Sequence, residues 1–189
     1  FNEGNAMQYF WSVPHNVDAL TDFCGGKEAM EKRLDTFTSQ VKHGWAPDVP
    51  YYWLGNEPCF GSAYVYNFLG KAWKSQRMVR NVLNRFDDTP NGLPGDDDAG
   101  AMSALYVFSA MGLYPYIPGI GGFVVTGPLF TKVQLQLKGG KTLTLIGENA
   151  GNDAPYIQRL QVDGRETTST WLDWNKLKHG ARLNFVMGK

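Results

Sequence analysis

Apolar residues in the first 113 or so positions recur every three or four residues, the spacing of amphipathic helices. Met30, Leu34 and Phe37, for example, fall on one stripe. The pattern predicts helices over residues 5–12, 17–24, 28–38, 58–69 and 73–86, and a last helix that follows the aspartates near position 97 and ends at Gly112. Residues 40–56 are rich in aromatic and turn residues, which predicts a long, structured loop.

The period changes to two after Gly119, which indicates strands. Residues 132–138 alternate, with Val133, Leu135 and Leu137 on one face. Further strands are predicted at residues 123–125, 142–146, 156–162 and 182–186, with turns at residues 139–140 and 163–164. Helices followed by strands predict two segregated parts rather than a βαβ sheet. We therefore expect a helical part over residues 1–118 and an antiparallel β subdomain over residues 119–189.

The composition excludes several functional classes. The 189 residues carry no net charge and have a pI near 7, which argues against nucleic acid or an anionic membrane as partner. No apolar run approaches the roughly 20 residues of a spanning helix. Cys24 and Cys59 form no recognisable framework, so free thiols are favoured over a disulfide, and their redox state stays open. The chain begins at Phe1 without an initiator Met or signal peptide, so we expect a piece of a longer protein.

Three consecutive aspartates, Asp96, Asp97 and Asp98, lie between a Pro-Gly turn and the last predicted helix. In one interpretation one of them caps the helix and its two neighbours are solvated. In the other they form a carboxylate cluster that binds a metal or activates water, because crowded carboxylates favour a cation or a shared proton. The triplet alone leaves both interpretations open.

Two further carboxylates, Glu3 and Glu57, lie in similar surroundings, in the segments EGNAMQYFW and WLGNEP. Each precedes a predicted helix and has glycine, asparagine and aromatic neighbours. In a ring of helical hairpins such helix starts can converge on one mouth. Aromatic faces stack on sugar rings, amides and carboxylates bind hydroxyl groups, and two carboxylates perform acid–base chemistry. This combination favours a carbohydrate site.

Other catalytic and metal motifs are missing. A calcium-binding EF-hand loop starting at Asp96 would need a glutamate at its twelfth position, where Val107 stands. The three histidines, His15, His43 and His179, have no metal-ligand spacing, and no HExxH, GxSxG or P-loop motif occurs. Zinc hydrolysis, serine hydrolysis and nucleotide binding are therefore disfavoured.

Five segments together resemble glycoside hydrolase family 92, whose members are calcium-dependent, inverting exo-α-mannosidases. They are EGNAMQYFWSVPHNV, WLGNEP, AYVYNFLGKAWKSQRMVRNVL, GLPGDDDAGAMSALYVFSAMGLYP and YIQRLQVDG. They cover nearly the whole chain in the right order. The resemblance implies that residues 1–118 form the later helical hairpins of a partial (α/α)6 toroid. It also implies a longer parent chain, whose N-terminal part would complete the site.

The resemblance assigns roles to individual residues. Glu3 matches the general acid, and Asp96 and Asp98 match the two aspartates from which the general base is drawn. Asn56, Glu57 and Asp98 match a calcium-binding set. The substrate would be a mannose-containing glycan, as in N-glycan degradation, and the protein would be secreted or periplasmic. Nothing in the resemblance implies a nucleic-acid or membrane partner.

The resemblance also suggests which residues surround the substrate. Gln8, His15 and Trp53 are candidates for the substrate rim. The chain departs from the family at Met7, where tryptophan is usual, at Tyr51 and Tyr52, and after Glu57, and these departures leave the linkage specificity open. Two alternatives are kept: an isolated, non-catalytic fragment and a carbohydrate-binding module. Turnover of a mannoside distinguishes the enzyme from both.

Overall fold

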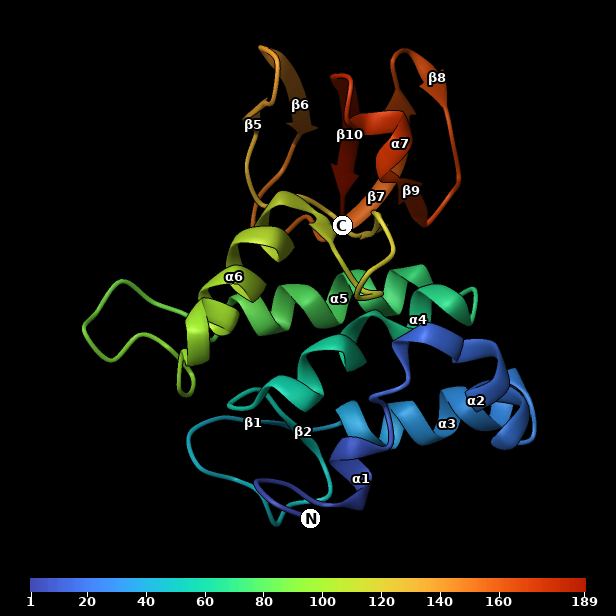
Figure 1. The fold of residues 1–189 in the computed structure, drawn as a ribbon, viewed down its shortest axis with the longest axis vertical. Helices are drawn as coiled ribbons and strands as arrows, with labels where there is room; N and C mark the ends of the chain where they lie inside the picture. Colours follow the sequence, from blue (N-terminus) through green and yellow to red (C-terminus); the bar gives the residue numbers. More distant parts are fainter. The chain divides into compact units, whose positions relative to one another are not determined.

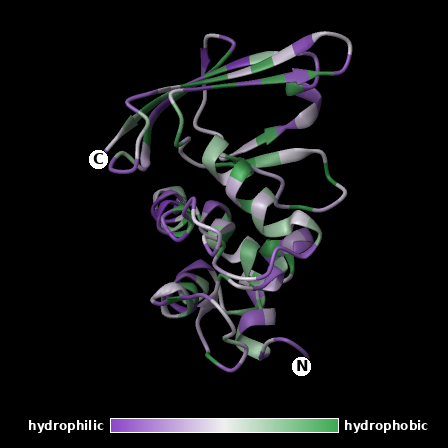
Figure 2. Cartoon of the chain, turned by 90° about the vertical axis from the view of Figure 1, so that its left-hand side faces the viewer, coloured by the Kyte–Doolittle hydropathy of each residue, from purple (hydrophilic) through white to green (hydrophobic).

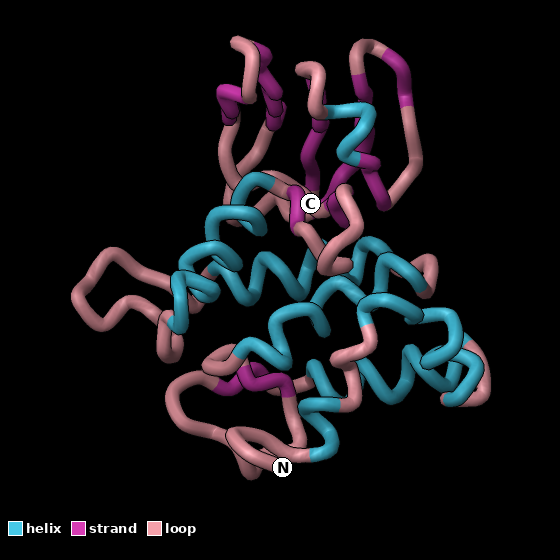
Figure 3. Tube along the Cα trace, in the orientation of Figure 1, coloured by secondary structure: helices cyan, strands magenta, loops and turns pink.

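A computed structural model describes residues 1–189 and resolves the chain into two compact units, 1–106 and 107–189. The first unit is mainly helical and the second contains most of the strands, as Figure 1 and Figure 3 show. The predicted order of helices first and strands after is therefore confirmed. Helix α6 (Ala101–Met111) spans the division between the units, and a domain boundary at residue 118 remains a prediction.

The helical unit contains short helical elements joined by ordered loops. In chain order they are α1 (Ala6–Tyr9), η1 (Pro14–Asn16), α2 (Val17–Phe23), α3 (Lys27–Thr38), β1 (Val41–Lys42), β2 (Tyr52–Trp53), η2 (Glu57–Tyr64), α4 (Val65–Phe68), α5 (Ala72–Leu83) and η3 (Asp98–Gly100), followed by the start of α6. The helices predicted at residues 17–24, 28–38 and 73–86 correspond to α2, α3 and α5. Helix α2 contacts α3, and α4 contacts α5, but a toroid remains a prediction.

The caps of the first helices follow from side-chain chemistry. Asn5 caps α1 and forms a capping box with Gln8. Asn16 caps α2 by accepting a hydrogen bond from Ala19 N. Helix α1 ends earlier than predicted, and the helix expected from residue 58 begins as the 3₁₀ segment η2. Gly61 lies within η2, and glycine weakens an α-helix by about 1 kcal/mol.

The loop predicted over residues 40–56 contains a feature that the sequence did not indicate. Strands β1 and β2 within it form a short parallel pair, with Val41 opposite Tyr52 and Lys42 opposite Trp53. Tyr52 is fully buried and packs edge-on against Phe37 of α3, with ring centroids 6.1 Å apart. Aromatic packing in the core thus fixes the end of this loop.

The sheet unit holds the end of α6, two sheets and one short helix. Its elements are β3 (Leu113–Tyr114), β4 (Gly122–Val125), β5 (Lys132–Leu137), β6 (Lys141–Glu148), β7 (Tyr156–Val162), β8 (Arg165–Glu166), β9 (Trp171–Asp173), α7 (Trp174–Leu177) and β10 (Ala181–Gly188). The strand order is β5-β6-β10-β7-β8 in the larger sheet and β3-β4-β9 in the smaller one. Each strand predicted from the alternation is present.

The predicted antiparallel pairing of the β subdomain is confirmed for every pair of strands but one. Strand β10 lies between β6 and β7; it is antiparallel to β7 but parallel to β6. The chain leaves β7, forms β8, β9 and α7, and returns to insert its last strand beside β6. Alternation identifies strands but not the partner that a returning strand chooses, so this pairing could not be predicted.

Alternating side chains build the core of the sheet unit. On β6, Leu143 and Leu145 are buried, and on β10 Leu183, Phe185 and Met187 are buried. Figure 2 shows this alternation of hydrophilic and hydrophobic residues along the strands. The turn between β5 and β6 comprises residues 138–140 and places Gly139 and Gly140 at φ 75° and 70°, a left-handed conformation that glycine adopts without steric cost.

Two further expectations concern the chain as a whole. The structure has no helix that is both long and apolar enough to cross a bilayer.

Cys24 and Cys59 are both free thiols. Burial raises the pKa of the Cys59 thiol to about 12, so this thiol stays protonated at neutral pH.

Candidate active site

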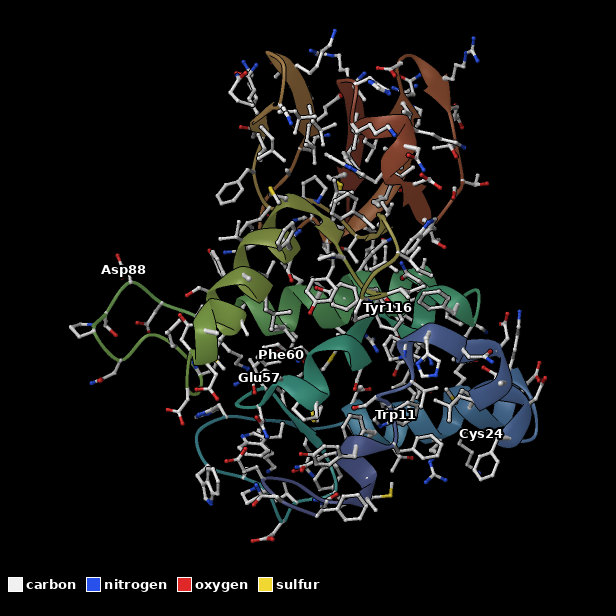
Figure 4. The ribbon with its side chains drawn as sticks, in the orientation of Figure 1. Trp11, Cys24, Glu57, Phe60, Asp88 and Tyr116 are labelled. Atoms are coloured by element: carbon white, nitrogen blue, oxygen red, sulfur yellow. The ribbon has the colours of Figure 1, made fainter.

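A hollow of about 180 Å³ opens in the helical unit, where segments far apart in the sequence meet. It is lined by Glu3, by Gly44 and Trp45, by Trp53 with residues 55–57, and by Gly95, Asp96 and Asp98. We call it the carboxylate hollow. Figure 4 labels Glu57 in the helical unit, where η2 begins. All three carboxylate motifs singled out from the sequence therefore contribute to one place.

Glycines hold the lining segments in backbone contact. A Cβ atom on Gly95 would lie 2.5 Å from Gly55 Cα, and one on Gly55 would lie 2.5 Å from Gly44 O. Real Cβ atoms do not approach other atoms so closely, so each position needs glycine. Gly44 N also donates a 2.7 Å hydrogen bond to Pro94 O. The three segments are thereby fixed against one another.

A tryptophan pair forms the apolar part of the lining. Trp53 is buried, and its indole N–H donates a hydrogen bond to Gly44 O. Trp45 contacts it edge-on, with ring centroids 5.6 Å and planes 83° apart, yet remains 72% exposed. A large aromatic side chain held in water beside polar groups is typical of a ligand contact.

Glu3 is held by its backbone rather than by its side chain. Asn56 Nδ2 donates a 2.7 Å hydrogen bond to Glu3 O, and Asn56 Oδ1 accepts one from Glu57 N. Glu3 has φ 51°, a left-handed conformation that costs a non-glycine residue roughly 1–3 kcal/mol. Gly4 follows, where a Cβ would lie 2.7 Å from the Tyr9 ring. Such strained backbone is concentrated at functional sites.

The aspartate triplet divides into two roles. Asp97 accepts hydrogen bonds from Ser103 Oγ at 2.6 Å and from Ser103 N at 2.9 Å, so it ties the turn to the first part of α6. The Ser103 hydroxyl and then the Ser103 backbone N–H lower the pKa of Asp97 below its usual value. Asp96 and Asp98, by contrast, line the hollow. Ala99, at φ 51°, turns the backbone between them and the helix.

The charge in the carboxylate hollow is of one sign. Four carboxylates, Glu3, Glu57, Asp96 and Asp98, line it, and no lysine, arginine or histidine does. Clustered carboxylates favour a bound cation or a retained proton. No three acidic, histidine or cysteine side chains converge closely enough to hold a metal ion by themselves. Any cation held here would therefore also need amide, backbone or water oxygens.

Two residues expected at the substrate rim do not line the hollow. Gln8 is 1% exposed, and its amide is used inside the protein: Nε2 donates to Ala46 O and Val49 O, and Oε1 accepts from Asn5 N. In this structure Gln8 supports the aromatic loop instead of facing the hollow. His15 is exposed in η1 and is likewise outside the lining.

Sequence reasoning did not single out Trp45 or the glycines Gly44, Gly55 and Gly95 as part of the site. The signal for Trp45 was its position in an aromatic loop, but its exposure could not be read from the sequence. The glycines give no signal in one sequence, because their contacts with the other lining segments join residues 11 to 50 positions apart.

The sequence profile of the glycosyl hydrolase family 92 catalytic domain matches residues 1–189. A curated relative, an uncharacterised secreted glycosidase of Arthroderma benhamiae, is 33% identical over 186 residues, which are 96% of this chain and 23% of the relative.

Solved structures of family GH92 mannosidases are also similar to this chain. The family GH92 α-mannosidase BT3965 from Bacteroides thetaiotaomicron superposes with a TM-score of 0.90 at 34% identity, over 99% of this chain and 25% of that chain. The family GH92 inverting mannosidase BT2199 from the same organism gives a TM-score of 0.88 at 34% identity, over 100% and 28%. The chain thus spans about a quarter of the length of the relatives it matches.

Proposed function

The chain belongs to glycosyl hydrolase family 92, and from that membership we propose that it carries the acid, base and calcium-binding residues of an exo-acting α-mannosidase. The enzyme hydrolyses terminal α-mannosides in glycans with inversion of configuration. The observation that carries this proposal is the carboxylate hollow, where four carboxylates from three separate segments meet without a neighbouring cation.

Two carboxylates perform the proposed reaction. Glu3, in its protonated form, gives its proton to the glycosidic oxygen as the bond to the anomeric carbon breaks. Asp96 or Asp98 removes a proton from a water molecule, whose oxygen attacks the anomeric carbon from the opposite face. An inverting enzyme needs room for this water, so its carboxyl groups stand roughly 6.5–9.5 Å apart. Glu3 and the aspartates come from different segments, which suits such a separation.

The lining residues fit a calcium ion by their chemistry. Asn56, Glu57 and Asp98 offer only oxygen as donor atoms, which is what calcium prefers, and no sulfur or imidazole lines the hollow. These three residues would hold the ion. When bound, calcium would neutralise part of the carboxylate charge and bind sugar hydroxyl groups.

The aromatic residues orient the substrate. The exposed Trp45 offers a face for the apolar side of a sugar ring, and the buried Trp53 supports Trp45 by packing edge-on against it. Asn56 fixes the backbone of Glu3 and so acts as a positioning residue. Substrate class is supported by relatives: one BT3965 structure contains mannoimidazole. The name of the curated relative supports action outside the cytoplasm, either secreted or periplasmic.

A direct test is hydrolysis of an aryl α-mannoside by the purified chain, with and without a calcium chelator. Glu3→Gln and Asp98→Asn are each expected to lower the rate at least about 100-fold, since general acid–base catalysis contributes factors of 10²–10⁴. Glu28→Gln, an exposed glutamate in α3, serves as the matched control. Hydrolysis that survives both substitutions, or resists chelation, contradicts the proposal.

A second candidate function is a non-catalytic, sugar-binding part that requires the remainder of a longer protein for turnover. The hollow's volume of about 180 Å³ favours it, because ligand sites usually enclose roughly 300–1,000 Å³. In this case a folded chain binds mannosides and calcium but does not hydrolyse the substrate. Activity would then appear only when the N-terminal part of the same protein is present.

A further inference from the structure

A second and larger hollow lies in the sheet unit and shares no residue with the carboxylate hollow. Its volume is about 580 Å³, within the range of sites for small ligands. Strand β8 is an edge strand of the larger sheet and β9 an edge strand of the smaller one, and residues of both line this hollow together with residues of α7. We call it the strand-edge hollow.

Trp171 of β9 supplies its aromatic surface. Trp171 pairs with Val124 of β4, but its indole lies diagonally across Gly122, where a Cβ atom would stand 2.6 Å from Trp171 Cε2. The glycine therefore lets the ring pack against the backbone of β4. This packing fixes the position of the ring, and the indole N–H of Trp171 donates no hydrogen bond within the protein. Trp171 is still partly exposed and lines the hollow.

Opposite charges line the strand-edge hollow without pairing. Arg165, Glu166 and Lys176 all line it, yet none of their side chains forms a hydrogen bond or an ion pair. Asp163 and Asp173 also line it, and each uses one carboxylate oxygen to bind a backbone N–H, at 2.7 Å in both cases. Donors and acceptors are thus both available around one indole ring.

We propose that the strand-edge hollow binds a neutral oligosaccharide, as a glycan-binding site separate from the hydrolytic one. A sugar hydroxyl both donates and accepts hydrogen bonds, which suits guanidinium, ammonium and carboxylate groups side by side. The indole provides the face on which an apolar ring surface stacks. Three carboxylates against two cations disfavour an anionic ligand, and the charged lining disfavours an apolar one.

The choice of probe rests on the proposed function, so α-linked mannotriose is used. The chain is labelled with ¹⁵N and carries Glu3→Gln, which prevents turnover during the titration. Its six tryptophan indole N–H signals are followed by NMR, and the Trp171 signal is identified by its loss in Trp171→Ala. Mannotriose is expected to shift the Trp171 signal in a saturable manner.

Side-chain variants separate binding from folding. Glu166→Gln and Lys176→Gln remove groups that have no partner in the protein, so the fold is expected to persist. Each is expected to raise the Kd for mannotriose, measured from the Trp171 signal, about tenfold, which corresponds to 1.4 kcal/mol of binding free energy. Glu28→Gln and Trp73→Ala, at exposed positions of the helical unit, are the matched controls and should leave the titration unchanged.

The proposal is overturned if the Trp171 signal does not move, or if Glu166→Gln and Lys176→Gln leave its titration unchanged. Failure of the two proposals can be told apart. If only the proposed hydrolysis fails, the wild-type chain shows no turnover while the Trp171 signal still titrates. If only this inference fails, the wild-type chain hydrolyses the mannoside while the Trp171 signal stays fixed.

Discussion

The helical unit and the sheet unit hold their shapes in different ways. In the sheet unit, regular strands alternate and bury one continuous set of aliphatic and aromatic side chains. In the helical unit, the segments around the carboxylate hollow have little regular structure and are fixed by glycine contacts and single hydrogen bonds. The stability of the sheet unit is therefore spread over many contacts, whereas the geometry of the site in the helical unit depends on a few.

The largest effect on stability is expected in the sheet core. Phe185→Ala removes a ring that is 1% exposed and leaves a cavity, which costs about 3–5 kcal/mol. Phe185→Leu keeps most of the volume and should cost less than about 1.5 kcal/mol. Urea unfolding measures both. Equal losses from the two variants would show that the sheet core is not close-packed.

A single methyl group should disrupt the helical unit's site. Gly95→Ala places its Cβ 2.5 Å from Gly55 Cα, so the segments must separate at a cost of about 1–3 kcal/mol, and hydrolysis should fall with them. Gly151→Ala in the sheet unit is the control, because its Cβ would meet only Asp153 Oδ1 at 3.6 Å. A Gly95→Ala chain as stable and active as its Gly151→Ala counterpart would contradict the proposed role of the glycine contact.

A smaller effect is expected from the amide that holds Glu3. Asn56→Ala removes the hydrogen bond to Glu3 O and should cost about 1 kcal/mol of unfolding free energy. The stronger consequence should be a lower kcat, because Glu3 loses the contact that positions it. Asn175→Ala, which removes an exposed hydrogen bond from Lys178 in the sheet unit, is the control. Unchanged kcat in Asn56→Ala would argue against a positioning role.

The smallest effect concerns pH. Bonds from Ser103 hold the pKa of Asp97 below its usual value near 3.8. A carboxyl with a depressed folded pKa stabilises the protein above that usual value, and the contribution is lost as the pH falls through the folded pKa. Ser103→Ala should therefore lower Tm slightly at pH 6, and the difference in Tm from wild type should narrow below pH ~4. A gap of constant size down to pH 2 would exclude this linkage.

The same contrast explains what could be predicted from the sequence. Periodicity located α3, α5 and the strands β5 and β6, because side-chain burial within a regular element repeats along the chain. It did not reveal the parallel pairing of β10 with β6 or of β1 with β2, since pairing joins distant residues. The motifs singled out Glu3, Asp96 and Asp98, which line the carboxylate hollow, but not Trp45, which also lines it. Gln8 was expected at the substrate rim, but its side chain completes the cap of α1. The sequence cannot distinguish these two uses of an amide near the start of a helix.

We infer that the three aspartates have different roles: Asp97 stabilises the start of α6, and Asp96 or Asp98 faces the substrate. Asp96→Asn, Asp97→Asn and Asp98→Asn keep the shape of each side chain, so kcat and Tm can be measured across the three variants. We predict that Asp97→Asn lowers Tm with the smallest loss of kcat, and that Asp96→Asn or Asp98→Asn lowers kcat at least about 100-fold with Tm unchanged. If Asp97→Asn showed the largest loss of kcat with Tm unchanged, the three aspartates would not have these separate roles.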